Sequence, residues 1–99
     1  MQSKAAKIAE LLKVLANENR LMILCALMEQ PMAVGAIAAR VPAITQSALS
    51  QHLALMKSHG ILSAEKKGQS VTYAIHDHRV EQIIHVLKAH YCEPAGSDL

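Results

Sequence analysis

The sequence predicts a mainly helical fold that carries one small β-hairpin. Apolar residues recur at helical spacing over most of the chain, and two short segments in its second half read as strands. The length of 99 residues fits one domain, so we expect residues 1–99 to form a single domain with 93–99 as a flexible tail. A chain this short buries only about 60–65% of its unfolded surface, so pairing with a second copy would add core.

Composition argues against a membrane protein and against a protein that binds single-stranded nucleic acid. Apolar residues make up 52% of the chain, but no apolar run is long enough to span a bilayer. The first residues lack the apolar block of a signal peptide, so we expect no membrane partner and a place in the cytoplasm. Only two aromatic residues occur, Tyr73 and Tyr91, which argues against binding single-stranded nucleic acid by base stacking. Because the net charge is only +2, a DNA-binding surface would need its basic groups gathered in one place.

Two amphipathic helices are predicted in the first third of the chain. The first has four apolar residues at the i, i+3, i+4 and i+7 positions, namely Ile8, Leu11, Leu12 and Leu15. Asn17 is suited to cap the helix that follows. That second helix repeats the spacing with Leu21, Leu24, Cys25 and Met28. Cys25 is therefore expected on the core stripe of the second helix, which Pro31 ends.

A helix-turn-helix is predicted next. Residues 34–40 form a short third helix, and Pro42 favours an extended residue before it, which makes a tight connection. Thr45 is a suitable N-cap for a fourth helix that runs to about His59. Gly60 follows at the position where a helix stop is expected.

A hairpin and a final helix complete the predicted fold. Residues 61–65 and 70–75 are expected to be strands, and Lys66-Lys67-Gly68-Gln69 is expected to be the basic tip that joins them. Asp77 then opens a last helix with its apolar face formed by Val80, Ile83, Ile84 and Leu87. Three helices, a turn, a helix and a hairpin in this order make a winged helix-turn-helix.

The fourth helix points to DNA as the partner. Leu49, Leu53 and Met56 share one face, which must be the core face. The opposite face is small and polar, with Ser47, Ser50, Gln51, Ala54 and Ser58. Such side chains let a helix lie deep in the major groove and hydrogen-bond base edges and phosphates. A face that is merely solvated usually carries several Lys and Glu, whereas this one is uncharged until Lys57.

These segments resemble the ArsR/SmtB family over nearly the whole chain. The specific run is Ser47-Ala48-Leu49-Ser50-Gln51-His52-Leu53, followed by Gly60-Ile61-Leu62, Gly68 and Tyr73. The resemblance implies a homodimer held by the first and last helices, bound to double-stranded DNA with an inverted repeat and usually repressing transcription. The DNA contacts that it implies are Thr45, Gln46, Ser47, Ser50, Gln51 and His52 in the fourth helix and Lys66, Lys67 and Gln69 in the wing. His52 lies at the edge of the apolar face, so a packing role and a DNA contact both stay open.

Two cysteines suggest the signal that such a regulator senses. The pair Cys25 and Cys92 resembles that of the BigR/SqrR/HlyU branch of the family, which implies a dithiol switch responding to reactive sulfur or oxidants. One thiolate attacks the oxidant, and the second resolves the product as a disulfide or polysulfide bridge. A bridge between the second and last helices would shift the spacing of the two recognition helices, which must match one DNA turn of about 34–36 Å. A pair of inert cysteines is the alternative.

Zinc is the alternative signal, and otherwise no cofactor is expected. The Cys-x-Cys motif of the family's metal sensors is absent from residues 31–37. A second metal site of the family lies between the last helices of the dimer, and Asp77, His90 and Glu93 match its ligands in spacing. Arg79 stands where a histidine is expected, and arginine does not ligate metals.

Other classes of protein fit the sequence less well. The chain has no glycine-rich phosphate loop and no convincing catalytic triad, so we do not expect an enzyme. A helical interaction module without DNA binding would tolerate neutralisation of Lys66 and Lys67. A regulator that activates indirectly, by displacing a silencer, is a third alternative.

Overall fold

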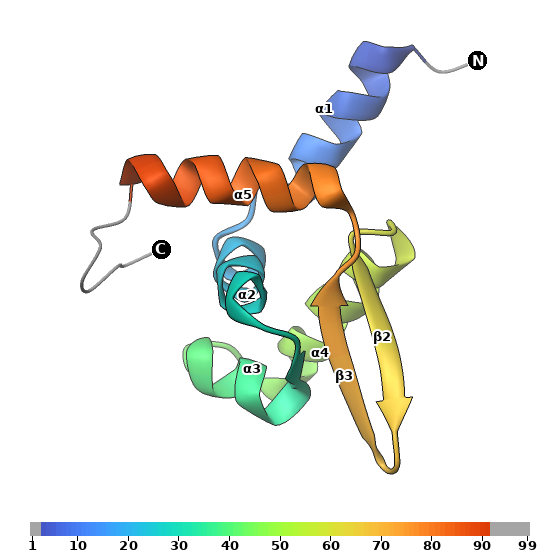
Figure 1. Cartoon of the computed structure of the whole chain (residues 1–99), viewed down its shortest axis with the longest axis vertical. Coiled ribbons are helices and arrows are strands. Elements are labelled where there is room, and N and C mark those ends of the chain that lie inside the picture. The colour runs from blue at the N-terminus through green and yellow to red at the C-terminus, as the bar shows by residue number, and fades with distance from the viewer. Residues whose placement is uncertain (1–2, 92–99) are drawn as a thin grey trace.

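The computed structural model describes residues 3–91, with the side chains of residues 3–90. Within that range the chain forms helices around a small sheet (Figure 1). In chain order the elements are α1 Lys4–Leu15, α2 Glu18–Glu29, β1 Met32–Ala33, α3 Val34–Arg40, α4 Gln46–Ser58, β2 Leu62–Lys67, β3 Ser70–Ile75 and α5 His78–Tyr91. The expected tail at 93–99, together with Cys92, lies outside the described residues. The predicted winged helix-turn-helix is confirmed, with α3 and α4 as its two helices and β2 and β3 as the wing.

Side-chain caps fix where the helices begin. Ser3, Asn17 and Thr45 each accept a hydrogen bond from the backbone N–H three residues further on, at 3.1, 3.1 and 3.0 Å. Asp77 accepts one from the backbone N–H of Arg79 at 2.9 Å, just before α5. Such caps satisfy N–H groups that a helix leaves without an internal acceptor. The predicted caps at Asn17 and Thr45 are therefore confirmed.

The sheet has three antiparallel strands in the order β1–β3–β2, one strand more than the predicted hairpin. β2 and β3 pair along their whole length. The additional strand β1 pairs Met32 with Tyr73 and Ala33 with Thr72. Two residues are too few to show an alternating pattern, so periodicity could not predict β1. The strand ties the connection between α2 and α3 to the wing.

The tip of the wing differs from the prediction. Lys66 and Lys67 are expected in the turn, but they are the last two residues of β2, and Lys67 is paired with Ser70. The turn itself is Gly68-Gln69. Gly68 has a φ of +62° and Gln69 a negative φ, as a type II′ turn requires. Because successive side chains of a strand point to opposite faces, the two lysines lie on opposite sides of the wing.

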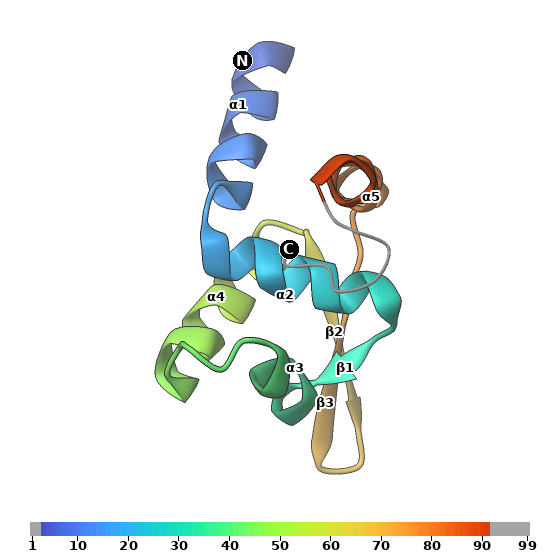
Figure 2. The ribbon, with the colours of Figure 1, turned by 90° about the vertical axis from the view of Figure 1, so that its left-hand side faces the viewer.

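The core gathers side chains from most elements of the fold. Its fully buried members are Ile23, Leu24, Ile37, Val41, Leu49, Leu53, Met56, Ile61, Val80 and Ile84. α2 runs through the middle of the molecule, α5 lies across it, and α3 and α4 lie on its other side (Figures 1 and 2). The core face predicted for the fourth helix is confirmed, since Leu49, Leu53 and Met56 are each at most 1% exposed.

Among the side chains of residues 3–90, three large apolar ones are exposed outside this core. Ile8 and Leu12 on α1 are 55% and 48% exposed, and Val86 on α5 is 53% exposed. Figure 2 shows α1 projecting from the body of the molecule, and its buried residues, Val14 and Leu15, belong to its last turn. The apolar stripe predicted for the first helix is thus only partly covered within one chain. None of the helices in the described range is both long and apolar enough to cross a membrane.

Candidate DNA-binding surface and sensor site

The exposed face of α4 carries most of the DNA contacts that the sequence predicts. Ser47, Ser50 and Gln51 are exposed on the side opposite the core face. Thr45 and Gln46 are exposed at the N-terminal end of the helix. α4 contains no acidic residue. A polyanion can therefore approach this face without meeting a carboxylate of α4.

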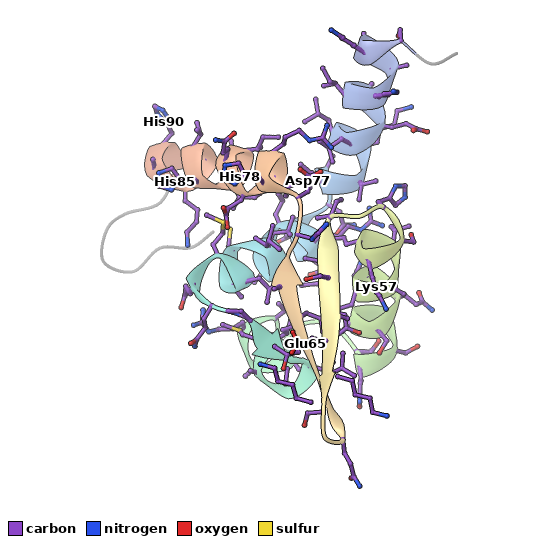
Figure 3. The ribbon with its side chains drawn as sticks, turned by 45° about the vertical axis from the view of Figure 1, so that its right-hand side comes forward. Lys57, Glu65, Asp77, His78, His85 and His90 are labelled. Atoms are coloured by element: carbon purple, nitrogen blue, oxygen red, sulfur yellow. The ribbon has the colours of Figure 1, made fainter. Side chains whose placement is uncertain are left out.

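Exposed basic side chains lie at the end of α4 and on the wing, whose strand β2 contacts α4. Lys57, in the last turn of α4, is exposed, as are Lys66, Lys67 and Gln69 on the wing. Figure 3 shows Lys57 on α4 and Glu65 on the neighbouring β2. Lys67 Nζ lies 4.0 Å from Glu65 Oε1, but an ion pair between exposed groups is weak, so it leaves the lysine available to another anion. Lys57 is not among the contacts predicted from the sequence, and its exposed place in the last turn of α4 makes it a candidate phosphate contact.

His52 is half-buried and bonded to another helix. Its Nδ1 accepts a hydrogen bond from Arg20 Nε at 3.2 Å. Burial and, after it, the charge of Arg20 lower the pKa of His52 below its ordinary value of 6.5, so the ring is neutral at neutral pH. The structure thus gives this histidine a packing contact. Arg20 could not be predicted from the sequence as a partner of His52, because the bond joins positions 32 residues apart.

Cys25 belongs to α2, which contacts α5. Cys25 is 4% exposed in α2, as its place on the core stripe predicts, whereas Cys92 lies outside the described residues, directly after the end of α5 in the sequence. The pKa of Glu29 is lowered, first by the hydrogen bond from Arg40 and to a smaller degree by the charge of Lys88. Glu29 follows Cys25 by one helical turn, and Lys88 precedes Cys92 by the same number of residues. Cys25 therefore lies one helical turn from the part of α2 that approaches Lys88 of α5.

The predicted zinc ligand Asp77 is engaged by an arginine. Its carboxylate accepts hydrogen bonds from Arg79 Nη2 at 2.8 Å and from Arg79 Nε at 3.1 Å. The bond from the Arg79 side chain is the main cause of the lowered pKa of Asp77. His90 lies at the other end of α5 (Figure 3), and Glu93 lies outside the described residues. Asp77 thus already holds a cation, and within one chain the described residues form no cluster of three His, Cys, Asp or Glu side chains suited to a metal ion.

The helix-turn-helix segment matches a known protein family. Residues 17–64 match the family described as "Bacterial regulatory protein, arsR family". This range contains α2, α3, α4 and the start of β2. The match therefore covers the elements that carry the candidate DNA contacts of α4, while α1, most of the wing and α5 lie outside it.

Longer matches extend the likeness to nearly the whole chain. The transcriptional activator HlyU of Vibrio cholerae is 40% identical over 93 residues, which cover 94% of this chain and 85% of that protein. A solved structure of HlyU from Vibrio cholerae matches with a TM-score of 0.86 at 40% identity, over 94% of this chain and 100% of that one. A structure described as reduced HlyU from the same species matches with a TM-score of 0.84 at 40% identity, over 90% of this chain and 93% of that one.

Two further relatives indicate the range of the group. The biofilm growth-associated repressor of Agrobacterium fabrum is 32% identical over 94 residues, which cover 95% of this chain and 80% of that protein. A homodimeric winged helix-turn-helix DNA-binding domain from Mycobacterium bovis matches with a TM-score of 0.72 at 30% identity, over 89% of this chain and 85% of that one. The named relatives are regulators of transcription and not enzymes. This chain therefore belongs to the arsR family of bacterial regulatory proteins and is a winged helix-turn-helix, DNA-binding transcriptional regulator.

Proposed function

We propose that two copies of this chain bind, as a homodimer, to double-stranded DNA that carries an inverted repeat. The observation that carries this proposal is the small, uncharged exposed face of α4, together with the exposed lysines of the wing strand that contacts α4. Each α4 would lie in a major groove with Ser47, Ser50 and Gln51 toward the base edges, while each wing contacts phosphates. The symmetry of the dimer would match half-sites about 34–36 Å apart. We place this activity in the cytoplasm, where bacterial DNA is found.

Neutralising the wing tests this arrangement. The double variant Lys66→Ala/Lys67→Ala is expected to bind its DNA about tenfold more weakly, because phosphate contacts supply much of the affinity of such proteins. The slope of log affinity against log salt should fall by about 1 to 2, depending on whether one or both lysines contact phosphate. Titration of a fluorescent duplex at several salt concentrations measures both quantities.

A matched control separates the wing from charge in general. Lys4→Ala/Lys7→Ala removes the same charge from exposed positions of α1, which projects at the end of the molecule away from the wing (Figure 1). This control should keep the affinity and the salt slope within about twofold, since interactions beyond about one Debye length are screened. An equal loss in the two double variants would mean that the wing has no special role.

The finer function that we propose is repression controlled by thiol chemistry at Cys25 and Cys92. The likeness to a protein whose structure is described as reduced supports a redox role. Further support comes from the contact between α2 and α5, because Cys25 lies in α2 and Cys92 directly follows α5 in the sequence. When two thiols form a disulfide they lose two electrons and two protons to the oxidant. Because Cys25 is buried in the core, we expect a bridge at its sulfur to change the packing of α2 against α5 and so the position of the helix-turn-helix.

Treatment with a polysulfide tests the switch. The DNA affinity of the reduced chain should fall by about 5- to 150-fold, the usual range of coupling between two sites. Cys25→Ser and Cys92→Ser should each keep their affinity under the same treatment, because neither can form the bridge. Intact mass measured on the same samples should show the loss of two hydrogens, or the addition of bridging sulfur, in the unaltered chain alone. Release of DNA from either serine variant would contradict the mechanism.

Activation by displacing a silencer is the second candidate. The name of the relative HlyU as a transcriptional activator favours it, whereas the Agrobacterium relative is named a repressor. Both directions use the same DNA-binding surface. Transcription from a promoter bearing the bound sequence, measured with and without the silencer, separates them.

A further inference from the structure

One side chain joins three helices at the corner between α1, α2 and α4. Arg20, in the first turn of α2, donates from Nη1 to the backbone carbonyl of Val14 at 3.0 Å and from Nε to His52 Nδ1 at 3.2 Å. Val14 lies in the last turn of α1, where a helix leaves its carbonyls without internal donors. The cation also sits at the negative end of the α1 dipole. Asn17 caps α2 by accepting a hydrogen bond from the backbone N–H of Arg20 at 3.1 Å, and it takes part in neither of these two side-chain bonds.

We propose that Arg20 and His52 form a brace that positions the recognition helix α4 relative to α1, and that His52 serves DNA binding through this brace rather than by touching DNA. The proposal deepens the function proposed above, since it takes α4 as the recognition helix and α1 as part of the dimer contact. Arg20 and His52 are positioning residues in this scheme.

The brace matters because it connects the two elements whose separation decides DNA binding. α1 carries Ile8 and Leu12, the exposed apolar residues that a second copy would cover. α4 carries Ser50 and Gln51, the residues expected at the base edges, and Gln51 is next to His52 in the sequence. Two recognition helices must sit about one DNA turn apart to enter successive major grooves. The planar guanidinium of Arg20 is bonded to α1 through Nη1 and to α4 through Nε, so it restrains the position of α4 relative to α1 better than a single hydrogen bond would.

The brace works only while His52 is neutral. Nδ1 accepts from Arg20 Nε, so the ring proton must be on Nε2. Protonation would place a second donor and a second positive charge against the guanidinium. The pKa of His52 is lowered by burial and then by the charge of Arg20, the charged group acting on the ring from α2, while α1 contributes to this corner the neutral carbonyl of Val14. The brace is therefore fully present above the ordinary histidine pKa of 6.5 and is lost as the pH falls through the lowered pKa of His52.

The test measures the affinity of single and paired variants for a duplex that the unaltered chain selects from a random DNA library. At about pH 7.5, Arg20→Ala and His52→Leu should each weaken binding about tenfold. The pair Arg20→Ala/His52→Leu should be no weaker than either single variant, because both remove the same interaction. His52→Asn should bind within about threefold of the unaltered chain, since its Oδ1 offers an acceptor where Nδ1 lies.

Three readouts separate the brace from a DNA contact and from simple loss of stability. The salt slope of His52→Leu should match that of the unaltered chain, whereas loss of a phosphate contact would lower it by about 1. Between about pH 7.5 and pH 5.5 the unaltered chain should lose affinity relative to His52→Asn, a difference that isolates this histidine from the others. Inserting one base pair between the half-sites should weaken binding of the unaltered chain by a larger factor than it weakens binding of the Arg20→Ala variant.

Asn17→Ala is the matched control at the same corner. It removes the cap of α2 but neither side-chain bond of Arg20, so it should lower the unfolding midpoint while leaving the salt slope and the half-site preference unaltered. Equal affinity of His52→Leu and the unaltered chain would overturn the brace. So would a His52→Asn variant as weak as His52→Leu, because the ring would then act by contact with DNA or by shape. If the unaltered chain selects no duplex at all, the proposed function fails first and the brace falls with it.

Discussion

The Ser50→Glu variant is expected to fold normally and to lose DNA binding by at least about 100-fold. Ser50 is exposed on α4, opposite the core face, and glutamate is a better helix former than serine, so the fold should tolerate the change. In the proposed complex the new carboxylate would face the phosphates and base edges of the groove. Like charges brought together at an interface cost several kcal/mol, and about 2.7 kcal/mol already corresponds to a 100-fold loss of affinity.

The measurement is a titration of labelled duplex, accompanied by thermal unfolding to show that the variant is folded. Gln30→Glu supplies the matched control, because Gln30 is exposed at the C-terminal end of α2, outside the proposed DNA surface, and the change in charge is the same. The control should lose no more than about twofold, because a single distant charge is screened by salt. Binding by Ser50→Glu at the level of Gln30→Glu would show that α4 does not enter the groove with this face.

The helices could be predicted from the sequence because local rules decide them. The spacing of Leu49, Leu53 and Met56 and the cap at Thr45 are properties of neighbouring residues, and the structure confirms both. The wing turn was predicted two residues too long. A two-residue turn is decided by the pairing of Lys67 with Ser70, which composition does not show. β1 was missed for the same reason, since it exists only through its pairing with β3.

In the candidate site, too, some features follow from the local sequence and others depend on how the helices pack. The exposed polar face of α4 follows from helical periodicity alone. The bond between Arg20 and His52 does not, because it depends on how α2 packs against α4 across 32 positions of the chain. From the sequence, Arg79 is predicted only to leave the zinc site without one ligand, because arginine does not bind metals. Its two side-chain bonds to the Asp77 carboxylate show in addition that a cation already occupies that ligand.

Leu12→Glu and Val86→Glu are each expected to break the proposed dimer and so to weaken binding to the inverted repeat. Leu12 and Val86 are 48% and 53% exposed in the single chain, so neither change should unfold it. In the proposed homodimer they would be covered, and an open groove along α5, lined in part by Ile83, Val86 and Leu87, marks the apolar face that carries Val86. Burying a leucine or valine side chain contributes about 1.5–3 kcal/mol, and an unpaired buried carboxylate costs more.

Two-fold symmetry doubles the effect of each variant, because the same patch contributes from both copies in an isologous contact. Each variant should therefore sediment as a monomer at micromolar concentration and bind the inverted repeat at least about 100-fold more weakly, since one bound copy no longer places the second at its half-site. Affinity for a duplex with one half-site should stay within about threefold of the value for the unaltered chain on the same duplex, because the α4 surface is unchanged. Gln30→Glu should remain dimeric. A variant that stays dimeric and still binds the full repeat would move the contact away from α1 and α5. The brace at Arg20 would then not connect α4 to a helix of the dimer contact, and it could not set the spacing of the two recognition helices.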